Sequence, residues 1–291
     1  MKKLLVTGAS GFLGWNLCQI AQSEWQVYGT YCSQPIEISG VSVQKVDLTN
    51  FQAMKHLFQA IQPDTIIHTA AQSSPNFCQS NPEASHLINV TAACNLAGLC
   101  ADASIPCVFT STDLVFNGLN SPYQETDPVC PINLYGEQKV LAELGMLARY
   151  PRTTVCRMPL MFGIAPPTAT SFMQPFIQIL KAGKDLSLFT DEFRTPVSGK
   201  TAAQGLLLAL EKVQGYIHLG GKERLSRYDF GRLLVETLEL PATGLKACQQ
   251  KDVKMAAPRP PDVSLNSSKA FALGYTPLSI REELQALKGL V

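Results

Sequence analysis

Three glycines follow the first apolar run of the chain at intervals of three residues. The segment MKKLLVTGASGFLG places Gly8, Gly11 and Gly14 directly after a strand-like run and before an amphipathic stretch typical of a helix. In a dinucleotide-binding turn, the first glycine permits a tight turn, the second lets the backbone approach a pyrophosphate, and the third allows close packing of helix on strand. An ordinary glycine-rich loop is the alternative. The pattern predicts a phosphate-binding strand–turn–helix unit.

Strand-like and helix-like segments alternate along the first half of the chain. The strand-like segments are KKLLVT, QVYGTY, SVQKV, DTIIHTA, PCVFTS and TTVCRM. Such alternation is typical of a parallel sheet with helices on both faces. We therefore expect an α/β fold, with a Rossmann-type doubly wound parallel sheet in an NAD(P)-binding domain of residues 1–158.

Residues 159–291 have a different sequence pattern, because proline pairs in GIAPP and RPP interrupt regular structure. Between these we expect a strand at GYIHLG and four helices. The expected helices are SFMQPFIQILKAG, SGKTAAQGLLLALEKV, SRYDFGRLLVETLEL and SIREELQALKGL. No linker separates the halves, so the sequence predicts a smaller substrate-binding α/β lobe interlocked with the sheet domain.

Composition argues against several classes of partner. The 24 basic and 23 acidic residues leave a net charge of +1, so we expect no nucleic-acid partner. No apolar run approaches the ~18 residues of a membrane span, so we expect no membrane partner. Nine cysteines without a C-x-x-C pair or a His/Cys cluster predict free thiols, a cytoplasmic location and no metal site. A homodimer is the default expectation for oligomeric state.

The end of the second strand bears on the choice of cofactor. An acidic residue about twenty positions after the glycine turn commonly binds the ribose of NAD, but VYGTYCSQ contains neither Asp nor Glu. It also contains no arginine to attract a 2′-phosphate, so NADP(H) is favoured only modestly over NAD(H). Asp47, after the third strand, has two interpretations: contact with the adenine edge, or a cap preceding the next helix.

Two further segments carry groups suited to proton transfer. Tyr135 and Lys139 lie four residues apart and share one face of an expected helix, while Thr112 ends the strand-like segment PCVFTST. A phenol beside an ammonium is biased toward ionisation, so Tyr135 is expected to exchange a proton with a carbonyl or alcohol near neutral pH. A Y-x-x-x-K pair alone is weak evidence, but its position after the glycine turn favours a catalytic role.

At this point the sequence resembles the extended short-chain dehydrogenase/reductase family, and in particular its dTDP-4-dehydrorhamnose reductase branch. The matching segments are TGASGFLG, HTAA, STDLVFNG, PYQETDPVCPINLYGEQKVLAE, CRMPLMFG, DEFRTP, GYIHLGG and RPPDVSLNSSKAFALGY. The resemblance implies Tyr135 as proton donor, Lys139 as ribose anchor and Thr112 as partner of the substrate oxygen. The residues that it and the glycine turn assign to the cofactor are Gly8, Ser10, Gly11, Phe12, Leu13, Gly14, Asp47, Leu48, Ala70, Ala71, Tyr135 and Lys139.

The resemblance implies an NAD(P)H-dependent reductase of a 4-keto nucleotide sugar. Sugar dehydratases of the family follow the threonine with Asp-Glu, whereas Leu114 follows Asp113 here, which disfavours elimination of water. A nucleotide-sugar 4-epimerase and a non-catalytic NADP-binding regulatory subunit remain as alternatives. Ser111, Thr112 and Arg194 are the expected substrate contacts. Arg194 is assigned to a substrate phosphate, with a solvated surface position as the alternative.

Overall fold

All seven strand-like segments pair in one sheet in the computed structural model, which describes residues 1–291. Its strands are β1 (Lys3–Thr7), β2 (Gln26–Tyr31), β3 (Ser42–Lys45), β4 (Thr65–His68), β5 (Cys107–Thr112), β6 (Thr154–Met158) and β11 (Gly215–His218). Every pairing is parallel and the order is β11-β6-β5-β4-β1-β2-β3. The strand order reverses between β1 and β4, and in open α/β sheets ligands bind at the carboxyl ends of the strands there.

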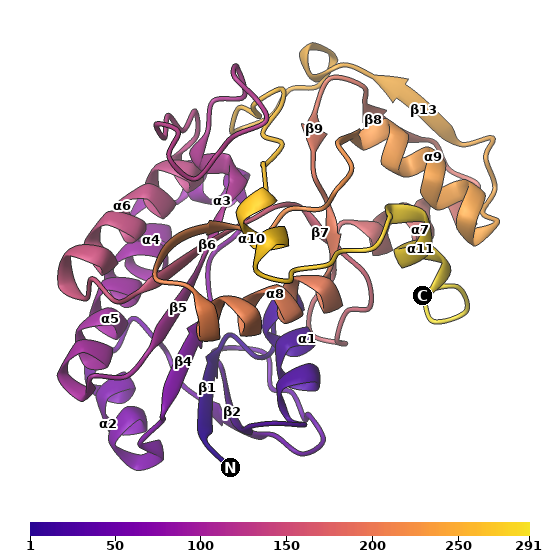
Figure 1. Cartoon of the computed structure of the whole chain (residues 1–291). Helices are drawn as coiled ribbons and strands as arrows, with labels where there is room; N and C mark the ends of the chain where they lie inside the picture. Colours follow the sequence, from indigo (N-terminus) through magenta and orange to yellow (C-terminus); the bar gives the residue numbers. More distant parts are fainter.

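Helices cover both faces of this sheet, as the alternating pattern predicts (Figure 1). Helices α1 (Phe12–Ala21) and α8 (Gly199–Lys212) pack on one face, around a core of 23 buried residues that includes Leu4 and Leu206. Helices α2 (Phe51–Ile61), α5 (Ala92–Ala103) and α6 (Leu134–Arg149) cover the other face and bury 19 residues. Burial of apolar surface on both faces of the sheet is the main source of its stability.

A composite helix runs from Pro82 to Ala103 through α4 (Pro82–His86), a π-helical turn η1 (Leu87–Thr91) and α5. This stretch is long and apolar enough to span a membrane by length and composition alone. Its inward residues nevertheless pack in the core beneath the sheet, and these are Ala92, Ala93, Leu96, Ala97 and Cys100. Such packing is typical of the core helix of a globular domain.

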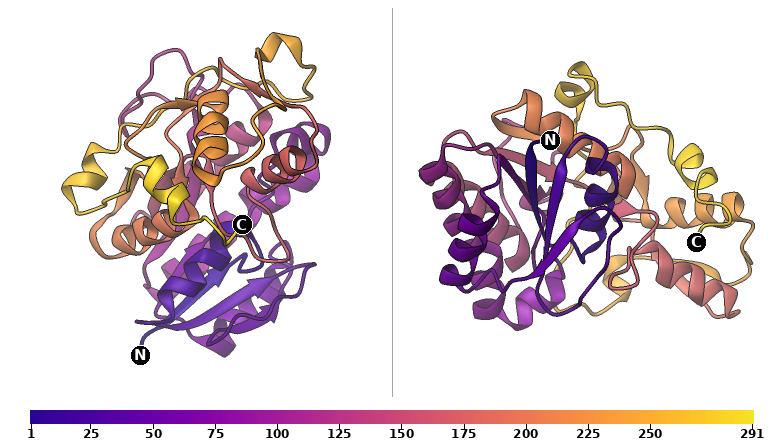
Figure 2. Two further views of the ribbon diagram at one scale, coloured as in Figure 1. Left: turned by 90° about the vertical axis from the view of Figure 1, so that its right-hand side faces the viewer. Right: turned by 90° about the horizontal axis from the view of Figure 1, so that it is seen from below.

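The second half of the chain builds a smaller lobe beside the carboxyl edge of the sheet (Figure 2). It contains β7 (Met161–Phe162), α7 (Met173–Lys181), β8 (Leu186–Phe189), β9 (Phe193–Arg194), β10 (Val197–Ser198), β12 (Leu225–Ser226), α9 (Arg227–Leu238), β13 (Leu245–Cys248), η3 (Gln250–Asp252), α10 (Ser268–Ala272) and α11 (Ile280–Gln285). Of the four expected helices, the last is the shortest, because regular helix ends at Gln285. Phe162, Phe230 and Leu284 belong to the core of this lobe.

The two lobes share chain segments. Helix α8 and strand β11 come from the second half, yet α8 packs on α1 and β11 pairs with β6 at the edge of the main sheet. Segments from both sides of residue 158 therefore build the sheet domain, and the division of the chain at that residue stays a prediction. A cut after residue 158 would remove one strand and one covering helix from the sheet domain.

The glycine turn is shaped by close backbone contacts. Gly8 adopts φ +77°, and a Cβ at this position would lie 2.8 Å from the Ala70 backbone. A Cβ at Gly14 would overlap the carbonyl oxygen of Gly8, since the first turn of α1 rests directly on the loop. Both glycines thus serve the steric roles expected of the fingerprint.

Gly14→Ala should destabilise the fold by more than about 2 kcal/mol, because the methyl group cannot fit without moving the loop backbone. Gly98→Ala is the matched control within α5, where the nearest atom to an added Cβ lies 3.7 Å away. This control should be neutral or stabilising by up to about 1 kcal/mol. Urea unfolding of the two variants measures the difference, and equal effects would contradict the packing argument.

Candidate active site

One cleft of about 810 Å³ lies at the carboxyl ends of the strands and is lined by both lobes. Every residue assigned to cofactor or substrate from the sequence lines this cleft. They are Gly8, Ser10, Gly11, Phe12, Leu13, Gly14, Asp47, Leu48, Ala70, Ala71, Ser111, Thr112, Tyr135, Lys139 and Arg194. The fold therefore brings the assigned set together, while the individual contacts with ligands stay predictions.

The start of α1 fits a dinucleotide phosphate. Gly11 is the N-cap residue, no side chain caps the helix, and the first turn contains no acidic residue. The free backbone N–H groups and the positive end of the helix dipole therefore face the cleft without an internal anion. A pyrophosphate accepts hydrogen bonds from such N–H groups, and its negative charge suits the positive end of the helix dipole.

Asp47 lies at the part of the cleft that Cys32 and Ser33 also line, after β2. Its Oδ1 accepts hydrogen bonds from the backbone N and the Oγ1 of Thr49, at 2.9 and 2.7 Å. The cap of α2 is Asn50, whose side chain accepts from Ala53 N at 3.1 Å. Asp47 thus fixes the turn before the helix without being its N-cap, and its contact with adenine stays a prediction.

Helix α6 carries a row of buried ionisable residues on the side facing the sheet. Tyr135, Lys139 and Glu143 are 7%, 1% and 1% exposed and follow one another at intervals of four residues. The Lys139 ammonium lies 4.1 Å from the centre of the Phe109 ring, and the residue lines the cleft. An ammonium at a cleft wall fits a hydroxyl group of a bound cofactor, because it has three protons to donate.

Electrostatics modify the expected behaviour of the Tyr–Lys pair. Burial lowers the pKa of Lys139 to about 7, although Glu143 and Cys78 oppose this. Burial also raises the pKa of Tyr135 well above its usual value, the charge of Asp113 adds to this, and Thr112 opposes it. Removal from water thus disfavours ionisation of Tyr135, contrary to the expectation that the nearby ammonium biases the phenol toward it.

Ser111 and Thr112 end β5 with their hydroxyl groups already engaged. Ser111 Oγ donates to Glu143 Oε1 at 2.5 Å, and Thr112 Oγ1 donates to Asp113 Oδ1 at 3.2 Å. Glu143 also accepts from Arg157, in a buried ion pair of 2.9 Å. The Ser111 proton is therefore directed to Glu143, and contact of Ser111 with substrate stays a prediction.

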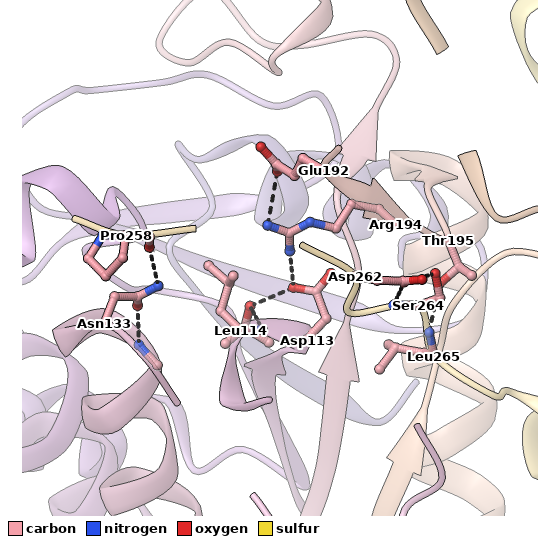
Figure 3. Close-up of polar contacts among 12 residues, drawn as sticks. Asp113, Leu114, Asn133, Glu192, Arg194, Thr195, Pro258, Asp262, Ser264 and Leu265 are labelled. Atoms are coloured by element: carbon pink, nitrogen blue, oxygen red, sulfur yellow. Dashed lines mark hydrogen bonds and ion pairs between the residues drawn. The ribbon is translucent and has the colours of Figure 1, made fainter. Parts of the chain in front are cut away.

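Arg194 is neither solvated nor a free cation. Its side chain is buried, and its guanidinium lies 2.8 Å from Asp113 Oδ1 and 3.1 Å from Glu192 Oε1 (Figure 3). Burial opposes its charge, but these two carboxylates more than offset it and raise the pKa of Arg194. The surface alternative is wrong, and a phosphate would have to compete with two carboxylates for this side chain.

Two other arginines line the cleft that sequence reasoning missed, Arg227 and Arg259. Arg227 begins α9, stacks over the rings of Phe172 and Phe176 at 4.1 and 5.4 Å, and has a buried Nη1 without a hydrogen-bond partner. Burial lowers the pKa of Arg227 to about 10, so it stays charged at neutral pH. Nothing in the segment SRYDF distinguishes this arginine from a solvated residue at a helix start.

The glycine turn, the parallel sheet and the cleft at its carboxyl ends define a Rossmann-type α/β fold of the kind that binds dinucleotides. Residues 1–288 match the family model described as the RmlD substrate binding domain, and the chain belongs to that family.

The relatives of this chain include proteins named as a subunit and a protein named as a reductase. The chain is 30% identical over 298 residues to the methionine adenosyltransferase 2 subunit beta of Rattus norvegicus, covering 97% of this chain and 87% of that protein. It is also 30% identical over 289 residues to the probable low-salt glycan biosynthesis reductase Agl14 of Haloferax volcanii, covering 97% and 96%.

Solved structures share the whole fold. The dTDP-4-dehydrorhamnose reductase of Bacillus anthracis, in complex with NADP, superposes with a TM-score of 0.88 at 21% identity and 99% coverage of both chains. A UDP-glucose 4-epimerase of Thermus thermophilus, in complex with NAD, gives a TM-score of 0.82 at 21% identity, covering 99% of this chain and 100% of that one. At these identities the likeness establishes the fold.

Lys139→Met should make the cofactor-free protein more stable at pH 6, with an advantage that shrinks as the pH rises toward 10. The pKa of Lys139 is about 7 in the folded chain against 10.5 for the free side chain, so the unfolded chain binds more protons between these values. The cost of burying the charge is therefore complete below pH 7 and is relieved above it.

Urea unfolding across this pH range measures the effect, with Lys200→Met, at an exposed position of α8, as the control. A stability difference for Lys139→Met that does not change with pH would contradict the argument.

Proposed function

We propose that the protein is an NAD(P)H-dependent reductase of a 4-keto nucleotide sugar, similar to dTDP-4-dehydrorhamnose reductase. The observation that carries the proposal is the convergence of Thr112, Tyr135 and Lys139 in the same cleft as the uncapped start of α1. The names of the Agl14 relative and of the Bacillus anthracis neighbour support it.

Each of the three side chains has a task that its environment suits. A bound nicotinamide supplies the hydride for carbonyl reduction. Tyr135 donates its phenolic proton to the substrate oxygen, and its raised pKa keeps it in the protonated form that reduction consumes. Lys139 binds a ribose hydroxyl through its ammonium, and Thr112 contacts the substrate oxygen from the end of β5.

A nucleotide-sugar substrate brings a diphosphate that needs cationic partners. Arg227 and Arg259 line the cleft from the C-terminal lobe and suit this role better than Arg194, whose guanidinium is engaged with Asp113 and Glu192. Arg259 donates to Ala257 O and to Asn76 Oδ1, which fixes its direction. Guanidinium groups suit phosphate oxygens because they donate two parallel hydrogen bonds.

A second candidate function is suggested by the methionine adenosyltransferase relatives, whose name is that of a subunit. In that case the protein would bind the dinucleotide and regulate a partner without turning over a substrate. Absence of turnover across a panel of 4-keto nucleotide sugars, together with recovery of a stoichiometric protein partner, would favour this function. A 4-epimerase would instead interconvert 4-hydroxy sugars without net consumption of cofactor.

Tyr135→Phe should lower the reductase turnover number by about 10²-fold or more, because it removes the proton donor. The dissociation constant for NADPH should change by less than about twofold, since the aromatic ring remains. Loss of NADPH absorbance with a 4-keto nucleotide sugar measures the first quantity, and NADPH fluorescence titration measures the second.

Tyr150→Phe is the matched control for this variant. Tyr150 directly follows α6 and has a buried hydroxyl without a partner, so its removal should leave turnover within about twofold of wild type. Wild-type turnover in Tyr135→Phe would defeat the proposed mechanism.

We further propose that NADPH is the better cofactor, because no carboxylate lies at the end of β2 to repel a 2′-phosphate. Ser33→Asp introduces one at a cleft-lining position just beyond that strand. It should lower kcat/KM for NADPH by about tenfold or more and leave the value for NADH within about threefold. Ser33→Asn controls for side-chain size, and equal losses with both cofactors would contradict the proposal.

A further inference from the structure

Asp113 links the catalytic strand to the C-terminal lobe through a single oxygen atom. Its side chain is buried at 2% exposure, directly after Thr112 at the end of β5. Its Oδ1 accepts a hydrogen bond from Thr112 Oγ1 at 3.2 Å and pairs with Arg194 Nη1 at 2.8 Å (Figure 3). The Oδ2 atom of Asp113 has no partner. Every hydrogen bond and ion pair of the Asp113 side chain within the protein therefore involves Oδ1.

The hydrogen bonds that Thr112 makes within the chain leave one hydrogen-bonding position of its hydroxyl group open. A hydroxyl group has one proton and two acceptor positions. Thr112 Oγ1 gives its proton to Asp113 and accepts a hydrogen bond from Leu114 N at 3.2 Å. One acceptor position remains, so Thr112 offers an acceptor to a ligand in the cleft while its proton is held by Asp113.

Arg194 brings the second lobe into this arrangement. It lies on β9, which pairs with β12 in the C-terminal lobe, and Glu192 from the same segment binds its Nη2. Glu192 and Asp113 thus hold the two ends of one guanidinium group, but only Asp113 belongs to the sheet domain. The orientation of Asp113 therefore depends on the seating of the C-terminal lobe.

We propose that Asp113 is a positioning residue: by accepting the Thr112 proton it fixes Thr112 Oγ1 as the acceptor for the alcohol formed from the substrate carbonyl, and Arg194 holds it there from the C-terminal lobe. This inference rests on the proposed reductase function. In the reaction, Tyr135 gives its proton to the substrate oxygen, and the new hydroxyl donates to Thr112. The product alcohol has one proton to donate, and an acceptor that is already oriented receives it without reorganisation.

The test is a double-mutant cycle between Asp113 and Thr112. Asp113→Asn should lower kcat by about tenfold and change KM by less than about threefold, because the residue acts on the forming product through Thr112. In a Thr112→Ala background the same substitution should change kcat by less than about twofold, since there is no hydroxyl left to position. Equal losses in the two backgrounds would overturn the proposal, as would a rise in KM with unchanged kcat.

Glu192→Gln is the matched control, because it removes the other carboxylate of the same guanidinium and leaves the Asp113–Thr112 hydrogen bond in place. Its kcat should stay closer to wild type than that of Asp113→Asn, and an equal or larger loss would count against the proposal. If Asp113→Asn does not fold, Arg194→Lys replaces it in both backgrounds. The loss of kcat should again disappear when Thr112 is absent, and its persistence there would overturn the proposal.

Crystal structures separate this inference from the proposed function. The Thr112 side chain should leave its wild-type rotamer in Asp113→Asn and keep it in Glu192→Gln, whether or not any substrate is known. A wild-type enzyme without turnover would defeat the proposed function, while the rotamer comparison would still decide the positioning role. An unchanged Thr112 rotamer in Asp113→Asn would overturn that role.

Discussion

The buried carboxylate of Glu143 is the group on which the arrangement of the site depends. It binds Arg157 through both of its oxygens, at 3.1 and 2.9 Å, and accepts the proton of Ser111. These contacts fix α6 against β5 and β6, so the helix presents Tyr135 and Lys139 beside Thr112. Removing two charges from water is costly, and the three hydrogen bonds to one carboxylate offset that cost. Its charge also opposes the effect of burial on the pKa of Lys139.

The sequence carried the information for most of the fold and for the membership of the site. Apolar periodicity marks all seven strands of the sheet, and the strict spacing of Gly8, Gly11 and Gly14 predicts a contact that can be verified atom by atom, Gly14 on the Gly8 carbonyl. Thr112 could be assigned to the site because it ends a parallel strand, and the carboxyl ends of parallel strands converge. Tyr135 could be assigned to it because it shares one face of α6 with Lys139. These features are local or follow from topology.

Electrostatic properties could not be read in the same way, because they depend on burial and on partners distant in sequence. The spacing of Tyr135 and Lys139 suggested a phenol poised to ionise, but spacing does not report how much water either group loses. Arg194 was recognised as a cleft residue, yet its partner Asp113 lies 81 positions earlier in the chain, on another lobe. Arg227 was missed because an arginine at the start of a helix is ordinarily solvated.

The burial of Lys139 helps to distinguish a dinucleotide-binding site from a surface that only docks a partner protein. A lysine with 1% exposure lowers stability, and its nearest aromatic contact, the Phe109 ring at 4.1 Å, offsets only a part of that cost. A scaffold that served only to dock a partner protein would gain stability from an apolar residue at this position. The buried ammonium, in one cleft with Thr112 and Tyr135, therefore argues for a site built around the hydroxyl groups of a dinucleotide. Dinucleotide binding alone does not require Thr112 and Tyr135 in the same cleft, and their presence there favours turnover.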